Sequence, residues 1–289
     1  MAMTIRNPLE WGWDQLRQAQ QAVEATGHAI GGAEPADAAA GRVVVRHIGM
    51  DDIAAALRLG MADFAACRTD VVFLGLVYAL AGIVLVHLTF GQDMLPLVFP
   101  LASGFALLGP VAAVGLYEMS RRRERGLEAS WADAFAVLRS PAFGAIAVLG
   151  LYLLAIFLVW LVAAFGIYQV TLGPLPPASI AAFAADVLTT PAGWVMILAG
   201  FAVGFVFAVV ALAISVVSFP LLLDRDVGLY PAIGTSIRAV AANPRPMATW
   251  GLIVAGCLVL GSLPLFLGLA FVVPVLGHAT WHLYRRLVP

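Results

Sequence analysis

The stretch from Ser140 to Ala185, SPAFGAIAVLGLYLLAIFLVWLVAAFGIYQVTLGPLPPASIAAFAA, contains no charged side chain. An α-helix needs about 20 mainly apolar residues to cross the hydrocarbon layer of a bilayer. The first part of this stretch meets that need, and we place a membrane span near residues 143–169. The prolines of residues 172–179 then end the helix, because proline lacks a backbone donor and clashes with the preceding turn. The sequence therefore predicts an α-helical membrane protein.

Further apolar stretches lie on both sides. Residues 71–90 and 95–117 each suit one span, and residues 187–223 suit one near 194–219. In the second of these, Pro110 is expected to kink the helix, because it cannot donate the hydrogen bond of an unbroken turn.

The last apolar stretch, residues 246–284, allows two interpretations. As one helix it would be about 58 Å long, about twice the layer to be crossed. A break at residues 261–264, Gly-Ser-Leu-Pro, would instead give a hairpin with spans at 247–260 and 265–283.

The positions of the basic residues indicate how the chain crosses the membrane. All 16 are arginines, and they lie in residues 1–70, after the second and fourth spans, and in the C-terminal tail. Cytoplasmic loops carry an excess of arginine, so both termini are expected in the cytoplasm. Five spans would leave Arg285 and Arg286 outside, which favours six. The expected fold is all-α, with six transmembrane helices as three hairpins in the bacterial cytoplasmic (inner) membrane.

Each predicted hairpin follows a short amphipathic segment and a helix break. In residues 51–66, 130–138 and 230–241, apolar side chains recur at helical spacing. We expect these segments to lie in the cytoplasmic interface with their apolar faces toward lipid. The unit of interfacial helix, break and hairpin would then occur three times, although short amphipathic loops are common in membrane proteins. The aligned side chains include Ile53, Leu57, Met61, Phe64, Tyr230, Ile233, Ile237 and Val240.

Residues 1–50 are expected to form a cytosolic N-terminal arm and linker, and residues 51–289 a six-span membrane domain. No secretory signal is expected, because residues 1–50 lack an apolar core of the required length. Residues 7–25 are a candidate helix that carries Trp11 and Trp13. This arm would dock a partner or the membrane surface, or pack on the protein's own cytoplasmic side.

The composition excludes several functional classes. Hydrophobic residues make up 62% of the chain and charged residues 11%, against roughly 25% charged in soluble domains. A formal net charge of −1 gives no basic field for nucleic acid.

Cys67 and Cys257 are far apart and form no C-x-x-C motif. Neither a phosphate-binding loop nor a G-x-S-x-G motif is present, so we expect no enzyme.

His278 and His282 form the one spacing that suits a ligand. Four residues apart, the two imidazoles share a helix face and could bind a metal or haem iron. Further ligands would be needed, and no Asp, Glu or Cys is close in sequence; His87 would lie at the opposite membrane face. The alternative, which we favour, is that both rings reach the cytoplasmic interface beside Trp281. No cofactor is therefore expected.

Charged and small residues near the spans give further hypotheses. The cluster of Arg121, Arg122, Arg123 and Arg125 could hold anionic lipid head groups, although its role in setting topology explains it equally well. Glu118 is expected to form an ion pair with a nearby arginine.

Gly200 and Gly204 form a G-x-x-x-G motif that suits close helix packing. Trp194 and Trp250 are expected at the membrane interface.

Several stretches together resemble a known family. They are DVVFLGL at residues 70–76, FPLASGFALLGP at 99–110, GLYEMSRR at 115–122 and VLGHATWHLYR at 275–285. They are similar to a bacterial family of predicted integral membrane proteins of unknown function, some labelled cytochrome c oxidase subunit I-like. The resemblance implies six spans and supplies no catalytic residues. A catalytic oxidase subunit would need about twelve spans and six metal-binding histidines, which this chain lacks.

Two functions remain open from the sequence. The first is a non-catalytic accessory or scaffold subunit of a larger inner-membrane complex, a respiratory one being the first candidate. The second is a carrier or channel for a lipid-like or apolar substrate, which would use the kinked second span.

The topology can be tested with a reporter fused after Pro289. The six-span arrangement predicts a cytoplasmic C-terminus, so a fused green fluorescent protein should fluoresce and a fused alkaline phosphatase should be inactive. The opposite pair of results would contradict an even number of spans.

Overall fold

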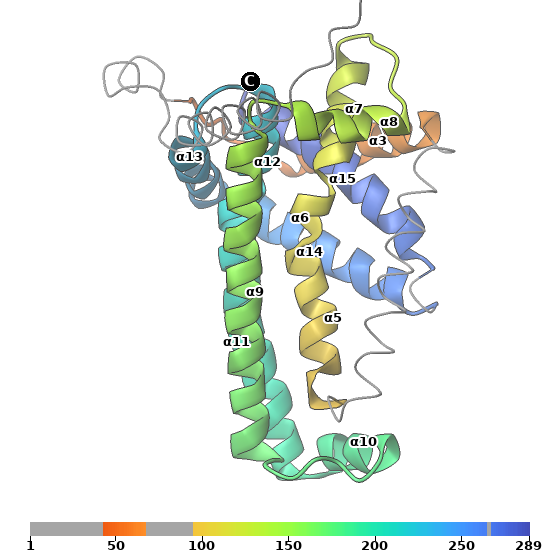
Figure 1. The fold of residues 1–289 in the computed structure, drawn as a ribbon, viewed down its shortest axis with the longest axis vertical. Coiled ribbons are helices and arrows are strands. Elements are labelled where there is room, and N and C mark those ends of the chain that lie inside the picture. Colours follow the sequence, from red (N-terminus) through yellow and green to blue (C-terminus); the bar gives the residue numbers. More distant parts are fainter. Residues whose placement is uncertain (1–42, 68–94, 265–266) are drawn as a thin grey trace, which may run out of the picture.

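The computed structural model describes residues 43–67, 95–264 and 267–289, and all its regular elements there are helices (Figure 1). Residues 1–42 of the predicted arm, the predicted span at 71–90 and His87 lie outside the described residues. The helices are α3 (Met50–Ala66), η1 (Leu95–Leu97), α5 (Val98–Leu107), α6 (Gly109–Ala112), α7 (Val114–Glu124), α8 (Trp131–Ala134), η2 (Phe135–Arg139), α9 (Phe143–Thr171), α10 (Ile180–Thr189), α11 (Pro191–Ser215), α12 (Ser218–Asp224), α13 (Leu229–Ala242), α14 (Pro244–Ser262) and α15 (Leu269–Leu287).

Three segments of the described chain are long and apolar enough to cross a membrane: Phe143–Thr171, Pro191–Asp224 and Pro244–Ser262. They agree with three predicted spans. Helices α9 and α11 run side by side along the molecule and are joined at one end through α10, which was not predicted (Figure 1). Ser179 caps α10, since its hydroxyl accepts a hydrogen bond from the Ala182 N–H at 3.1 Å.

Both predicted irregularities are confirmed. The second span is broken at Leu108 and Ala113 into α5, α6 and α7, around Pro110. The last apolar stretch is broken between α14 and α15. There Gly268 lies so close to Gly261 that an added Cβ would be 2.7 Å from the Gly261 carbonyl oxygen, so the tight reversal depends on both glycines.

Trp160 of α9 joins α5, α9 and α11 within the spanning region. Its Nε1–H donates to the Pro100 carbonyl at 3.1 Å and to Ser103 Oγ at 3.2 Å. A Cβ at Gly204 would meet the same indole at 3.1 Å, whereas one at Gly200 would meet nothing within 4 Å. Of the predicted G-x-x-x-G pair, therefore, one glycine packs inside the protein and the other does not.

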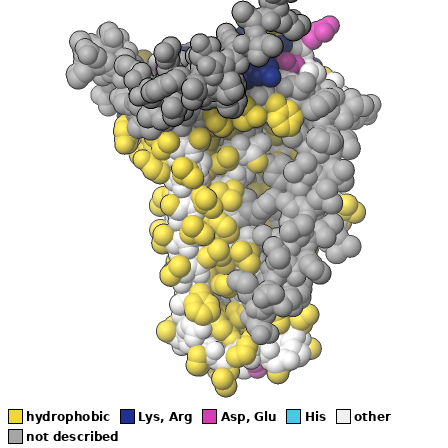
Figure 2. Space-filling view, in the orientation of Figure 1, with side chains coloured by type: hydrophobic (Ala, Val, Ile, Leu, Met, Phe, Trp, Pro, Cys, Tyr) yellow, Lys and Arg dark blue, Asp and Glu magenta, His cyan; other side chains and the backbone are white. Residues whose placement is uncertain are grey.

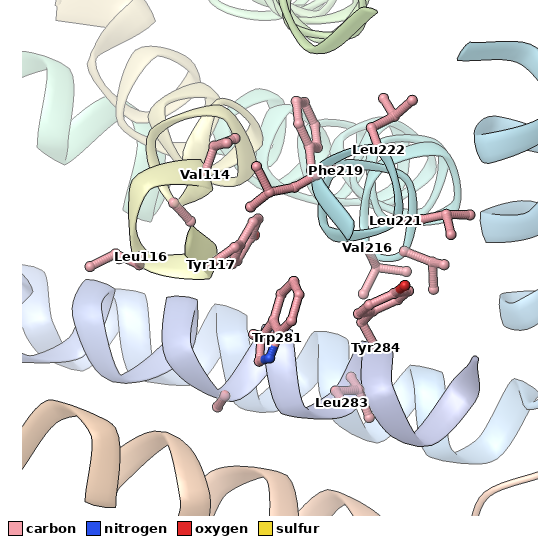
Figure 3. Packing of buried hydrophobic residues seen from close by; sticks show 14 of the residues in the cluster. Val114, Leu116, Tyr117, Val216, Phe219, Leu221, Leu222, Trp281, Leu283 and Tyr284 are labelled. Atoms are coloured by element: carbon pink, nitrogen blue, oxygen red, sulfur yellow. The ribbon is translucent and has the colours of Figure 1, made fainter. Parts of the chain in front are cut away.

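The arginine-rich end forms a compact cap of α3, α7, α8, α12, α13 and the C-terminal part of α15 (Figure 1). Its apolar core brings Leu116 and Tyr117 of α7 toward Phe219 of α12 and Trp281 and Tyr284 of α15 (Figure 3). These large side chains are fully or almost fully buried. The same core continues into the adjoining parts of α9, α11 and α14, including Leu149 and Trp250.

Asn243, between α13 and α14, fixes the start of the described chain. Its Oδ1 accepts from the Ile48 N–H at 2.8 Å and its Nδ2 donates to the Arg46 carbonyl at 3.2 Å. The Arg46 N–H in turn donates to the Leu287 carbonyl at 2.8 Å. Segments from both ends of the chain thus meet in the cap.

The three predicted interfacial segments are helical, but they differ from one another in which faces they bury and expose. In α13 the predicted apolar face is divided: Tyr230 is 58% and Ile237 45% exposed, whereas Ile233 and Val240 pack partly buried against the core. In α3 the buried face packs on α15 instead of lipid. The segment at residues 130–138 is only a turn of α-helix followed by η2, and at its start the Ser130 N–H donates to Asp133 Oδ2 at 2.9 Å.

The two tryptophans expected at the membrane interface differ in their exposure. Trp194 is exposed at the start of α11, as predicted. Trp250 is 1% exposed, so its prediction as an interfacial residue was wrong; the cap core surrounds it. On one side of the molecule the long helices present mainly hydrophobic side chains (Figure 2), as expected of a surface that faces lipid.

Replacement of Gly60 by alanine should loosen the cap. An added Cβ there would lie 2.5 Å from the backbone nitrogen of Ala279, so α3 and α15 must move apart at a cost of about 1–3 kcal/mol. At Gly256 of α14 a Cβ would meet nothing within 4 Å, so Gly256→Ala should be neutral or stabilising by up to about 1 kcal/mol. Thermal unfolding followed through maleimide labelling of the buried Cys67, in a Cys257→Ser background, measures both. Equal midpoints would contradict the close packing of α3 on α15.

Candidate functional site

A buried acidic side chain lies where α3, α7 and α15 meet. Asp63 of α3 is 6% exposed, and His278 of α15 and Ser120 of α7 are completely buried. The helices approach this closely because their contact residues are small. Gly60 packs against Ala279, and Gly277 packs against Leu116 of α7.

Asp63 is the centre of the hydrogen bonds in this cluster. Its Oδ2 accepts from Ser120 Oγ at 2.6 Å and from His282 Nε2 at 2.8 Å. Its Oδ1 accepts from Arg123 Nε at 2.9 Å. The carboxylate thereby receives three donors from two other helices, which compensates its removal from water.

The arrangement determines the tautomer of His278. Ser120 has one hydroxyl proton, which goes to Asp63, so its oxygen is left to accept from His278 Nδ1–H at 2.8 Å. His278 Nε2 then carries a lone pair, and this atom is buried without a hydrogen-bond partner among the described residues. Complete burial of the ring favours its neutral form.

Asp63 is charged in this environment. Burial raises the pKa of its carboxyl group, but the hydrogen bonds from His282 and Ser120 outweigh burial, and the net pKa lies below the ordinary 3.8. A carboxyl group with a lowered pKa stabilises the fold above its unfolded value, and this contribution is lost as the pH falls through the folded value. The cluster is therefore complete at neutral pH.

The two predicted histidines have different hydrogen-bond partners in the structure. His282 bonds to Asp63 and His278 to Ser120, and no group of three His, Cys, Asp or Glu side chains in the described segments is arranged to hold a metal ion. The expectation that both rings reach the interface is wrong for His278, which is completely buried. Ligation of a haem or a metal by these residues stays a prediction from spacing.

Sequence reasoning missed Asp63 and Ser120. One signal was available: Asp63 follows Ile53, Ala56 and Gly60 at helical spacing, on the face of α3 that the structure buries. A carboxylate in register with small residues points to a polar partner on the facing helix. The partner itself could not be identified, because His282 is 219 positions further along the chain.

A second network surrounds Asp224 at the end of α12. Its carboxylate accepts from the Tyr284 hydroxyl at 2.9 Å and from Arg285 Nη1 at 3.5 Å. Arg125 and Arg121 approach it at 3.5 and 3.7 Å. The network joins α7, α12 and α15 on the side of the cap that carries Trp281, whose Nε1–H donates to Glu124 at 3.0 Å.

The four arginines proposed to hold lipid head groups all have carboxylate partners within the protein. Arg121 pairs with Glu118 at 2.8 Å, as predicted for Glu118. Arg122 pairs with Asp133 at 3.1 Å, Arg123 with Asp63, and Arg125 with Asp224. Lipid binding by this cluster stays a prediction, with these ion pairs as competitors.

The chemistry that this cluster supports is limited by access. A serine nucleophile is activated by giving its proton to a general base, whereas Ser120 gives its proton to a carboxylate and accepts from His278. Its hydroxyl is also completely buried, so a substrate has no access to it in this conformation. The cluster is instead suited to fastening α3 onto α7 and α15.

Comparison with known proteins agrees with the membrane assignment. Residues 98–224 match the model of a family described as predicted integral membrane protein (DUF2189), which confirms the resemblance. The match runs from α5 to α12, so it includes Ser120 and Arg123 but not Asp63, His278 or His282. No curated protein and no solved structure matches the chain.

Replacement of Asp63 by asparagine should destabilise the cap strongly. Arg123 and His282 would each lose an anionic partner; because the Arg123 side chain is 35% exposed, we expect a loss of about 1–3 kcal/mol. Asp51, which is exposed on the first turn of α3, is the matched control, and Asp51→Asn should change stability by less than about 0.5 kcal/mol. Unfolding in detergent, measured by circular dichroism, compares them. The difference between wild type and Asp63→Asn should shrink only below pH 3.8, and a small difference at neutral pH would refute the role of the charge.

Proposed function

We propose that this integral membrane protein is a non-catalytic accessory or scaffold subunit of a larger complex in the bacterial cytoplasmic membrane. A respiratory complex is the first candidate. We further propose six spans in three hairpins, with both termini in the cytoplasm, as the distribution of arginines favours.

The exposure of the spanning helices supports this proposal most. Only 6% of the most apolar part of the span formed by α11 and α12 is buried inside the protein, against 28% for α9. Large side chains such as Leu198, Phe201 and Phe205 are more than 60% exposed. A helix that uses so little of its surface within its own chain has most of it available for lipid or for another membrane protein.

Outward-facing glycines make a protein partner the better candidate for part of this surface. Membrane helices associate through small residues that allow close backbone approach. Gly166 of α9, Gly200 of α11 and Gly256 of α14 have open space where a Cβ would lie. Lipid chains gain nothing from a glycine, whereas the backbone of a neighbouring helix can lie against it.

The alternative function, transport of a lipid-like or apolar substrate, is favoured by one observation. The consecutive helices α5, α6 and α7 form one span that is interrupted at Leu108 and Ala113. Broken helices are a feature of transporter binding sites. Against it, the described spans α9 and α11 contain no Asp, Glu, His, Lys or Arg, and α14 contains only Arg245 in its first turn, whereas coupled transporters use such groups at mid-depth.

Photo-crosslinking should distinguish the two functions. Benzoylphenylalanine at Phe201, on the exposed side of α11, should form an adduct with one other membrane protein in cells that express the full chain at its native level. The same group at Leu149 of α9, which is completely buried, should give no intermolecular adduct. Mass spectrometry identifies the products. Adducts with lipid alone at Phe201, together with purification of the protein without a stoichiometric partner, would overturn the subunit proposal and favour the carrier.

A further inference from the structure

The cations that are free to meet the membrane lie outside the cluster at residues 121–125. Arg139 directly precedes α9 as the last residue of η2, and Arg245 lies in the first turn of α14. Both are exposed, and neither has an ion pair or a side-chain hydrogen bond within the part of the chain that the structure describes. By contrast, every arginine of the 121–125 cluster contacts a carboxylate.

The two positions are equivalent within the chain. Each arginine is at the junction between an interfacial helix and a membrane span, next to prolines: Arg139-Ser140-Pro141 lies before α9, and Pro244-Arg245-Pro246 forms the first turn of α14. The junction therefore recurs with the predicted repeat. At both places the arginine is where a span leaves the arginine-rich end, which is the level of phospholipid head groups.

Exposed apolar side chains precede each arginine. In η2, Leu138 is 58% exposed while Val137 is buried. In α13, Tyr230 is 58% and Ile237 45% exposed, while Leu229 and Ala239 are buried. Water would be a poor solvent for these side chains, and a position at the boundary between head groups and acyl chains suits them.

The chemistry of these junctions fits one ligand. A guanidinium group binds phosphate through two parallel hydrogen bonds, and an adjacent apolar side chain lies against an acyl chain. The arginines of these junctions have no internal anion to compete with such a phosphate. We propose that the junctions at Arg139 and Arg245 each bind the head group of one anionic phospholipid, and that α13 and η2 rest on the lipid surface beside it.

The test is a titration of phosphatidylglycerol into the full-length protein in mild detergent, followed by native mass spectrometry. Wild type should bind two molecules more tightly than further ones, and it should bind phosphatidylcholine less well. Each removed cation should weaken binding about fivefold, so R139Q should lose one of the two tight sites and R139Q/R245Q both. R139K/R245K should bind more weakly than wild type but more tightly than R139Q/R245Q, because the charge remains while the two parallel hydrogen bonds of the guanidinium group are lost.

Two control variants locate the effect. R58Q removes an exposed arginine of α3 that is not at a junction and should bind as wild type does. R125Q removes a member of the 121–125 cluster and should also leave both tight sites. Retention of both sites in R139Q/R245Q, loss of a site in R125Q, or equal binding of phosphatidylcholine would each overturn the proposal. Thermal unfolding in detergent alone, expected to be unchanged by these exposed substitutions, separates lost binding from misfolding.

Discussion

The carboxylate of Asp63 is buried, and it must be surrounded by hydrogen-bond donors. This requirement determines how α3 packs against α7 and α15. A carboxylate moved out of water is costly unless it is paired and hydrogen-bonded. Asp63 meets this requirement only when α3 lies against both α7 and α15, because Ser120 and Arg123 come from one and His282 from the other. The close approach at Gly60 then places the helices within hydrogen-bonding distance.

The cap and the spanning hairpin are consequently held by different forces. In the cap, ion pairs around Asp63 and Asp224 are combined with a core of aromatic side chains. In the spanning region, the Trp160 indole of α9 donates to α5 and packs against Gly204 and Phe207 of α11. Lipid removes the hydrophobic driving force between spans, so the hairpin has no reason to bury much of its surface within its own chain.

Local patterns were sufficient to predict several elements of this fold. The start of α9 at Phe143, the break after Ser262 and the interruption near Pro110 each follow from apolar length and from glycine or proline, which act on neighbouring residues. The cluster could not be predicted in the same way. Contacts between Asp63 and His282 depend on how distant helices are arranged, and single-sequence periodicity contains no information about that. Helix α10 was missed because the prolines before it suggested a loop throughout.

The family match adds a constraint on how these parts relate. It covers α5 to α12 and stops before α13, α14 and α15. Ser120 and Arg123, which lie inside the matched region, are the groups that donate to Asp63 from α7, whereas Asp63 and His282 come from outside it. The matched region therefore contributes the spanning hairpin and one side of the cluster, and the flanking helices complete the cap around it. The exposed surface of α11 takes no part in forming the cap. A partner can therefore occupy this surface without disturbing the cap.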